Sequence, residues 1–167
     1  MKERMSMDGD MMRGLENFDR VWSRVTGEAC RTAEPPVHDD IPTLREFIND
    51  EARDAGYYAL LSRRMPGAAR TLMCISRDER VHLRELQVEY FLLCGDSSPT
   101  CESCPLFCGT LKALRMAYGS ECAGAAAYLK AAEETGSECL RALYREHAAD
   151  ETRHAEILRE LISRVMA

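Results

Sequence analysis

The sequence predicts an all-α antiparallel four-helix bundle, built from two helical hairpins joined by a long crossover and preceded by a short N-terminal helical arm. Three observations support this fold class. Ala, Leu, Glu, Arg and Met dominate the chain, and β-branched residues never alternate for long. Four long segments carry helix start and stop signals. Their connections are tight, long and tight in turn, as expected for two hairpins joined by a crossover.

The first predicted hairpin begins with a helix from Pro42 to Arg64. Either Asp40 or Thr43 is its N-cap, and Thr43 has capping-box spacing to a glutamate three residues later. The helix stops at the sequence Met-Pro-Gly, residues 65–67, and a second helix follows at once and runs to Cys94. The glycine directly after Cys94 is a typical helix terminator.

The second predicted hairpin follows a loop with the sequence GDSSPTCESCP. Its first helix runs from Pro105 to Thr135 and ends at Gly136. Ser137 is the N-cap of the last helix, which continues to Met166.

The chain divides into an N-terminal arm, residues 1–40, and the bundle, residues 41–167. In the arm, Leu15 to Val25 has its apolar side chains on one helical face, and Pro35-Pro36 marks a linker. A length of 167 residues suits one domain with an appended segment.

Composition and charge exclude several functions. A net charge of -6 with scattered Lys and Arg gives no basic stripe for nucleic acid, and the apolar runs are too short to span a membrane. The first residues do not form a secretory signal, so we expect a cytoplasmic protein.

An internal repeat relates the two halves of the bundle. Each half has a glutamate, a tyrosine seven residues later, and the pattern Asp-Glu-x-x-His on the following helix. This repeat predicts a pseudo-two-fold bundle with one site between its halves. The repeated residues are Glu51, Tyr58 and Asp78–His82 in the first half, and Glu121, Tyr128 and Asp150–His154 in the second.

The repeated glutamates and histidines occupy the apolar stripes of their helices. Several carboxylates buried together would repel one another unless cations neutralised them. Two divalent ions would balance four carboxylates, and Glu-x-x-His pairs on two helices with one Glu on each of the others form the ligand set of di-iron and di-manganese bundles. Oxygen-rich ligands favour iron (Fe²⁺/Fe³⁺), with manganese or zinc as substitutes. The predicted ligands are Glu51, Glu79, His82, Glu121, Glu151 and His154.

Four segments, EARDAGYY, SRDERVH, YGSECAGAAAY and AADETRHAEIL, resemble the rubrerythrin branch of the ferritin-like superfamily. The resemblance implies a ferritin-like bundle whose six ligands hold two iron ions, with Glu79 and Glu151 bridging them. It implies reduction of hydrogen peroxide or oxygen in oxidative-stress defence, with Tyr58 and Tyr128 near the metals. It also implies an electron donor such as rubredoxin, and a homodimer.

Two departures from the family pattern bear on function. Rubrerythrins carry a further glutamate one turn beyond the ligand Glu121, where this chain has Gly124. They also commonly carry a rubredoxin-like module with paired CxxC motifs, and this chain has no second CxxC. Two other functions therefore stay open: ferritin-like iron oxidation and storage, and a metal-stabilised interaction module without catalysis.

Protons for such a reaction would come from Tyr58, Tyr128 or His147. His147 lies one turn before Glu151, and we interpret it as a core histidine satisfied by a hydrogen bond rather than as a ligand.

The cysteines have several interpretations. The cysteines around the loop between the two hairpins could be thiols packed at a helix end, a redox-active pair formed by Cys101 and Cys104, or ligands of a second metal site. Three further cysteines, Cys74, Cys122 and Cys139, are expected to be small core residues, free in a reducing cytosol. The cysteines around the loop are Cys94, Cys101, Cys104 and Cys108.

Overall fold

A computed structural model describes residues 40–98 and 109–167, and in this part of the chain all regular structure is helical. The all-α prediction is therefore confirmed. The predicted arm helix and Cys101, Cys104 and Cys108 lie outside the described residues. The helices are α2 (Asp40–Arg64), η1 (Pro66–Ala68, a short 3₁₀ turn), α3 (Ala69–Cys94), α4 (Thr110–Glu134) and α5 (Glu138–Met166).

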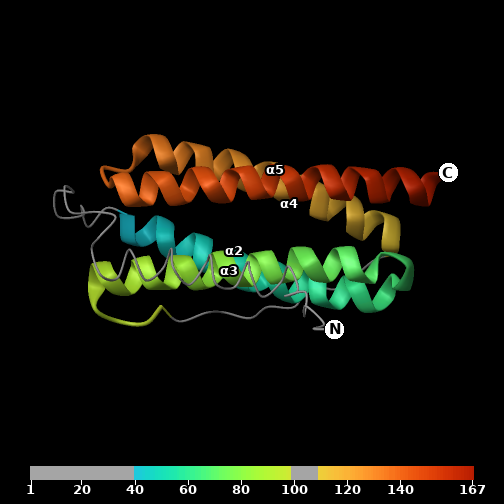
Figure 1. Ribbon diagram of the computed structural model, residues 1–167, viewed down its shortest axis with the longest axis horizontal. Helices are drawn as coiled ribbons and strands as arrows, with labels where there is room; N and C mark the ends of the chain where they lie inside the picture. The colour runs from blue at the N-terminus through green and yellow to red at the C-terminus, as the bar shows by residue number, and fades with distance from the viewer. Residues whose placement is uncertain (1–39, 99–108) are drawn as a thin grey trace, which may run out of the picture. The chain divides into compact units, whose positions relative to one another are not determined.

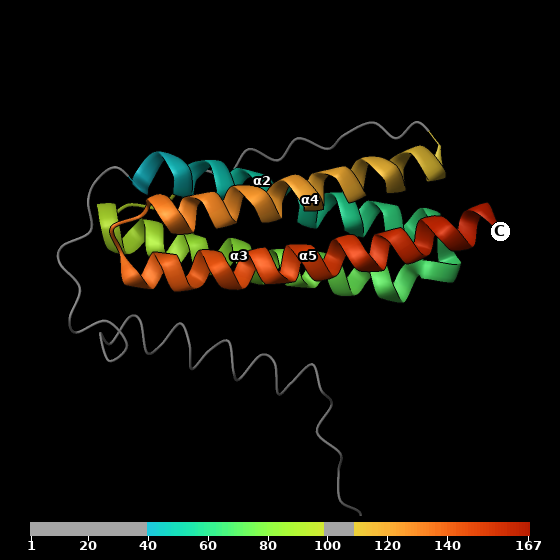
Figure 2. The same ribbon diagram turned by 90° about the horizontal axis from the view of Figure 1, so that it is seen from above.

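The four long helices form a bundle of two antiparallel hairpins. Helix α2 packs along α3, and α4 packs along α5 (Figure 1). Turned by 90°, the bundle shows α4 beside α2 and α5 beside α3 (Figure 2). Helix α3 ends and α4 begins at opposite ends of the bundle, so the connection between the hairpins is a crossover, as predicted. None of the described helices has a stretch long and apolar enough to cross a membrane.

Most of the predicted helix ends are confirmed. Gly95 follows α3 with a φ of 72°, and its N–H donates to the Phe91 carbonyl at 2.8 Å. A positive φ is a conformation that glycine adopts without a Cβ clash, which explains the stop at this residue. Ser137 is the N-cap of α5, and its hydroxyl accepts a hydrogen bond from the Leu140 N–H at 3.3 Å.

Two predicted helix starts were wrong. Helix α2 has already begun at Asp40, so Thr43 lies inside it and cannot be its N-cap. The Asp40 carboxylate instead accepts a hydrogen bond from the Thr135 hydroxyl at 3.0 Å. Helix α4 begins at Thr110 rather than Pro105, because Gly109 has a φ of 75° and interrupts any regular helix.

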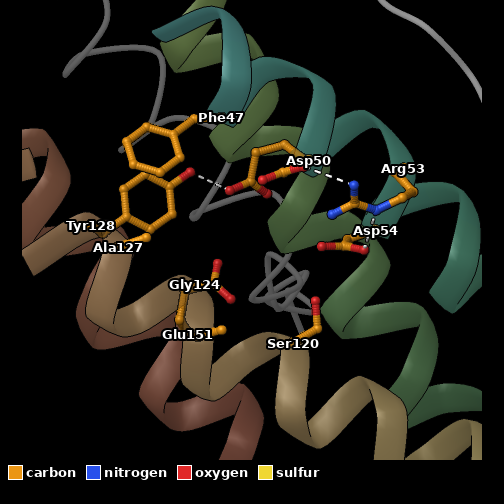
Figure 3. Close-up of a pocket in the computed structure, with 11 residues that line it drawn as sticks. Phe47, Asp50, Arg53, Asp54, Ser120, Gly124, Ala127, Tyr128 and Glu151 are labelled. Carbon is orange, nitrogen blue, oxygen red and sulfur yellow. Dashed lines mark hydrogen bonds and ion pairs between the residues drawn. The ribbon is translucent and has the colours of Figure 1, made fainter. Parts of the chain in front are cut away.

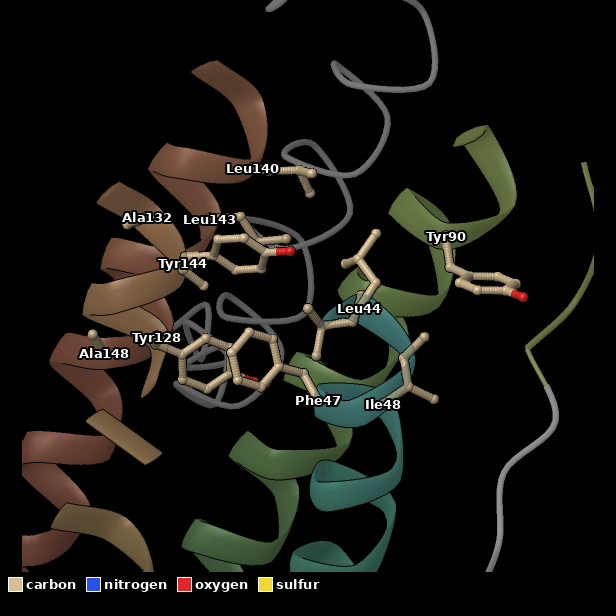
Figure 4. Close-up of a cluster of buried hydrophobic side chains, with 12 residues drawn as sticks. Leu44, Phe47, Ile48, Tyr90, Tyr128, Ala132, Leu140, Leu143, Tyr144 and Ala148 are labelled. Atoms are coloured by element: carbon tan, nitrogen blue, oxygen red, sulfur yellow. The ribbon is translucent and has the colours of Figure 1, made fainter. Parts of the chain in front are cut away.

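The core has two apolar layers with a polar layer between them. One apolar layer contains Leu44, Phe47, Ile48, Leu143 and Tyr144 (Figure 4). The other, toward the opposite ends of the same helices, contains residues such as Leu61, Leu72, Leu114 and Leu158. Buried glutamates and histidines lie on all four helices at sequence positions between these layers. The apolar layers therefore fix the spacing of the helices around the polar one.

We predict that Ser137→Ala lowers the free energy of unfolding by about 1 kcal/mol, since the first turn of α5 loses its side-chain cap. Ser137→Asp, which keeps an acceptor, should be close to wild type. Urea unfolding followed by circular dichroism measures both. Equal stability of the alanine variant and wild type would show that this cap contributes little.

Candidate metal centre

Six buried side chains from the four long helices meet in the polar layer. Each hairpin contributes one glutamate from its first helix and a Glu-x-x-His pair from its second. The helical period of 3.6 residues places the glutamate and histidine of each pair on the same inward face. These are the six residues predicted from the sequence: Glu51 on α2, Glu79 and His82 on α3, Glu121 on α4, and Glu151 and His154 on α5.

Their side chains form two overlapping groups, each of the size and composition of a metal site. In each group, one ligand atom from every residue lies within 4.8 Å of the others. Glu79 and Glu151 belong to both groups, so these two carboxylates can face two cations at once. The groups are Glu51, Glu79, His82 and Glu151, and Glu79, Glu121, Glu151 and His154.

Both histidines turn the same ring nitrogen toward the glutamates. His82 Nδ1 is 3.2 Å from Glu79 Oε2 and 3.5 Å from Glu151 Oε1. His154 Nδ1 is 3.0 Å from Glu79 Oε1 and 3.4 Å from Glu121 Oε2. The two Nδ1 atoms therefore lie beside different oxygens of Glu79, as expected for one imidazole per metal ion.

Three of the inward atoms show what kind of group fits between them. Glu79 Oε1, Glu121 Oε2 and His154 Nδ1 are fully buried, and within the described residues they make no hydrogen bond. A buried polar atom without a hydrogen bond is costly, and metal coordination satisfies both carboxylate oxygens and imidazole nitrogen. The donor set of four carboxylates and two imidazoles suits two divalent cations of borderline or hard character.

When no cation is bound, protons can balance the negative charge of these carboxylates. Burial raises the pKa of Glu51 to about 8 and that of Glu151 to about 10. Burial lowers the pKa of both histidines, but the surrounding carboxylates outweigh this effect and raise the pKa of His82 well above its ordinary value and that of His154 to about 12. Burial also disfavours the charged form of Glu79, but the close His154 and His82 rings, 3.0 and 3.2 Å from its oxygens, lower its pKa overall.

The two repeated tyrosines each bind a candidate ligand of the other hairpin. The Tyr58 hydroxyl donates to Glu121 Oε1, and the Tyr128 hydroxyl donates to Glu51 Oε1. Burial and the neighbouring carboxylates raise the pKa of both phenols well above 10, so both keep their protons near neutral pH. Each tyrosine can therefore orient a carboxylate without adding charge.

Two aspartates contact the outer ring nitrogens of the histidines, and neither was predicted as a site residue. His82 Nε2 is 3.2 Å from Asp150 Oδ2, and His154 Nε2 is 3.2 Å from Asp78 Oδ2. A carboxylate on the outer nitrogen fixes the ring so that the inner nitrogen faces the metal. The sequence did indicate these two residues, because each is the aspartate that begins an Asp-Glu-x-x-His repeat.

Arg153 joins these two outer carboxylates. Its guanidinium donates to Asp150 Oδ1 at 2.7 Å and to Asp78 Oδ2 at 3.2 Å. Burial alone would raise the pKa of Asp78 and Asp150, but both are only partly buried. Hydrogen bonds from histidine and Arg153 outweigh the effect of burial, so the pKa of each aspartate is lowered. Both aspartates therefore stay charged at neutral pH and keep their histidines in place.

His147 is buried beside the cluster. Its Nε2 lies 3.0 Å from Glu85 Oε2, and its ring stacks on His82 with centroids 4.2 Å apart. This contact fits the interpretation of a core histidine satisfied by a hydrogen bond. His147 also forms a third close group with Glu51 and His82. Glu85 was missed in the sequence, although it lies one turn beyond His82 on the same inward face.

The described cysteines correct part of the sequence analysis. Cys74 and Cys122 are exposed, so the expectation that they are core residues was wrong. Cys139 is half-buried and disulfide-bonded, so the expectation of a free core thiol, which rested on an assumed reducing compartment, was wrong. Cys94 is a free, exposed thiol that donates to the Tyr90 carbonyl. Its suggested role in a second metal or redox site stays a prediction.

The chain matches the rubrerythrin family model over residues 112–166. The matched segment covers nearly all of α4 and α5, and it includes Glu121, Glu151 and His154. The match confirms the resemblance to the rubrerythrin branch of the ferritin-like superfamily. No curated protein gives a significant match, and neither does any solved structure.

We predict that the metal-free protein loses stability as the pH rises from about 5 to about 8. Glu51 and Glu151 titrate near 8 and 10 when folded, above the ordinary value of 4.5, so the folded chain binds more protons than the unfolded chain in this window. The raised pKa values of His82 and His154 act in the same direction. Urea midpoints of chelator-treated protein at pH 6 and pH 8 measure the effect. Higher stability at pH 8 would contradict it.

A second prediction concerns the outer aspartates. Replacing Asp78 or Asp150 by Asn should weaken metal affinity about 10- to 100-fold, since the histidine loses the carboxylate that orients it. The exposed Asp96 provides the matched control, and Asp96→Asn should leave affinity unchanged. Competition titrations with a chromophoric chelator measure all three. Wild-type affinity in both site variants would show that the two aspartates do not support the ligands.

Proposed function

We propose that the cluster binds two iron ions and that the chain is a rubrerythrin-like oxidoreductase that reduces hydrogen peroxide or oxygen. The observation that carries this proposal is the sharing of Glu79 and Glu151 by two ligand groups. Two cations held by common carboxylates lie close enough to act on one small molecule. A single structural ion would need only one such group.

Bound iron would supply two electrons and Lewis acidity to an O–O bond. The protein's own part is to hold the ligands and to keep the surroundings dry. The apolar layers on both sides of the cluster exclude water from it along the bundle axis. The phenols of Tyr58 and Tyr128 fix two carboxylates and place O–H protons beside the cluster.

Catalysis would require electrons from outside the chain. We therefore propose a small reductant protein of the rubredoxin type as the donor, with a homodimer as the working form. The family resemblance supports both proposals. Iron storage would instead require a hollow shell of many subunits, so the mass in solution separates the two functions.

Metal counting tests the shared-ligand arrangement. Replacement of Glu79 or Glu151 by Gln should remove both metal ions, because each belongs to both groups. Replacement of Glu51 or Glu121 by Gln should leave one ion per chain, because each belongs to only one of the two groups that share these carboxylates. Gln keeps the size of the side chain and removes its charge. Elemental analysis after removal of loosely bound metal gives the count. Two ions retained in Glu79→Gln would refute the arrangement.

Peroxide consumption tests the activity. The iron-loaded protein, supplied with a reduced rubredoxin-type donor, should consume hydrogen peroxide, and Glu79→Gln should not. If the protein keeps two irons and consumes neither peroxide nor oxygen, the metal is structural and the proposed catalysis is wrong.

A further inference from the structure

A pocket of about 270 Å³ opens between α2 and α4 and reaches the candidate metal centre. Two of the carboxylates that we assign to the metals, Glu51 and Glu151, form part of its wall. Figure 3 shows the pocket with Asp50, Arg53 and Asp54 on the α2 side. This pocket gives the buried cluster a route to the surface between two helices.

Small residues of α4 create the pocket. Ser120, Ala123, Gly124 and Ala127 line it from the α4 side. A Cβ built on Gly124 would lie 3.4 Å from Glu151 Oε2, so a longer side chain at this position would extend into the space beside that carboxylate. The glycine has helical geometry without a positive φ, so backbone conformation does not require it. Its measurable effect is to leave room next to Glu151.

The walls of the pocket limit what can enter. Four carboxylates and one guanidinium line it, and Arg53 already pairs with Asp50 at 2.8 Å and with Asp54 at 3.5 Å. When cations neutralise Glu51 and Glu151, the remaining charged residues of the wall, Asp50, Arg53 and Asp54, carry no net positive charge, so the wall does not attract anions. The volume and the charge therefore both favour a small uncharged molecule.

We propose that this pocket is the entry and binding site for a small uncharged oxygen species, hydrogen peroxide or dioxygen, and that Gly124 keeps it open. The proposal rests on the proposed function, because it needs metal ions between Glu51 and Glu151. It adds a binding site, with Gly124 and Ala127 as its size-determining residues.

Nitric oxide is a suitable probe, because it is small and uncharged and changes the absorption of ferrous iron when it binds. The experiment uses the full chain loaded with ferrous iron, and stopped-flow absorbance gives the rate of binding. Gly124→Leu should slow binding by about tenfold or more, because the added methylenes fill the pocket. Gly119→Leu is the matched control on the same helix: a Cβ at Gly119 has nothing within 4 Å, and binding should proceed at the wild-type rate.

A second pair of variants avoids contact with Glu151. Ala127→Phe should obstruct the pocket wall, and Ala126→Phe, one residue away on an exposed position that does not line the pocket, should not. Iron content is measured for every variant, so that slower binding is interpreted only where two irons are retained. If Gly124→Leu loses iron, the Ala127 pair decides.

The possible outcomes separate the two proposals. Slow binding in Gly124→Leu and Ala127→Phe, with normal binding in both controls, supports the pocket as the entry site. Wild-type rates in both pocket variants with two irons retained overturn it and leave the metal centre intact. Failure of the wild-type chain to retain iron overturns the proposed function, and the pocket proposal with it.

Discussion

Mutual repulsion among four buried glutamates is the constraint on which the rest of the structure depends. Carboxylates at this depth keep their charge only beside positive groups, and in the described core the side chains beside them that can carry positive charge are histidines. The metal-free chain resolves the conflict by protonating Glu51 and Glu151, as their raised pKa values show. Cations would resolve it without protons. The charge state of the layer therefore contributes to how the stability of the bundle depends on pH.

The two apolar layers hold this polar layer in place. Phe47 stacks on Tyr128 with ring centroids 4.1 Å apart, and the Tyr128 hydroxyl reaches back to Glu51. Tyr58 has the equivalent position at the other end, within the second apolar layer and hydrogen-bonded to Glu121. Each tyrosine thus belongs to an apolar layer by its ring and to the polar layer by its hydroxyl. The packing of the two tyrosine rings in the core therefore also sets the orientation of the two carboxylates.

The helices and the six inward glutamate and histidine side chains could be predicted from the sequence, because helical periodicity and capping residues are local properties. Glu79 and His82 share a face whatever the helix packs against. The partners of the outer histidine nitrogens could not be predicted in the same way. The pairing of Asp78 with His154 depends on how α3 packs against α5, which cannot be predicted from the sequence of either helix alone. The pocket beside Gly124 likewise depends on the separation of α2 and α4.

The supporting contacts of the site cross between the hairpins. Tyr58 and Asp78, on the first hairpin, hold Glu121 and His154, on the second, and Tyr128 and Asp150 return the same contacts to Glu51 and His82. A half-length chain with one such hairpin would contain three of the six candidate ligands. Its tyrosine and aspartate would be placed to contact the glutamate and histidine of a second hairpin. Two identical copies related by a two-fold axis would complete one another. The present arrangement is what gene duplication and fusion of such an ancestral pair would produce, with later divergence that includes the buried Glu85 and His147.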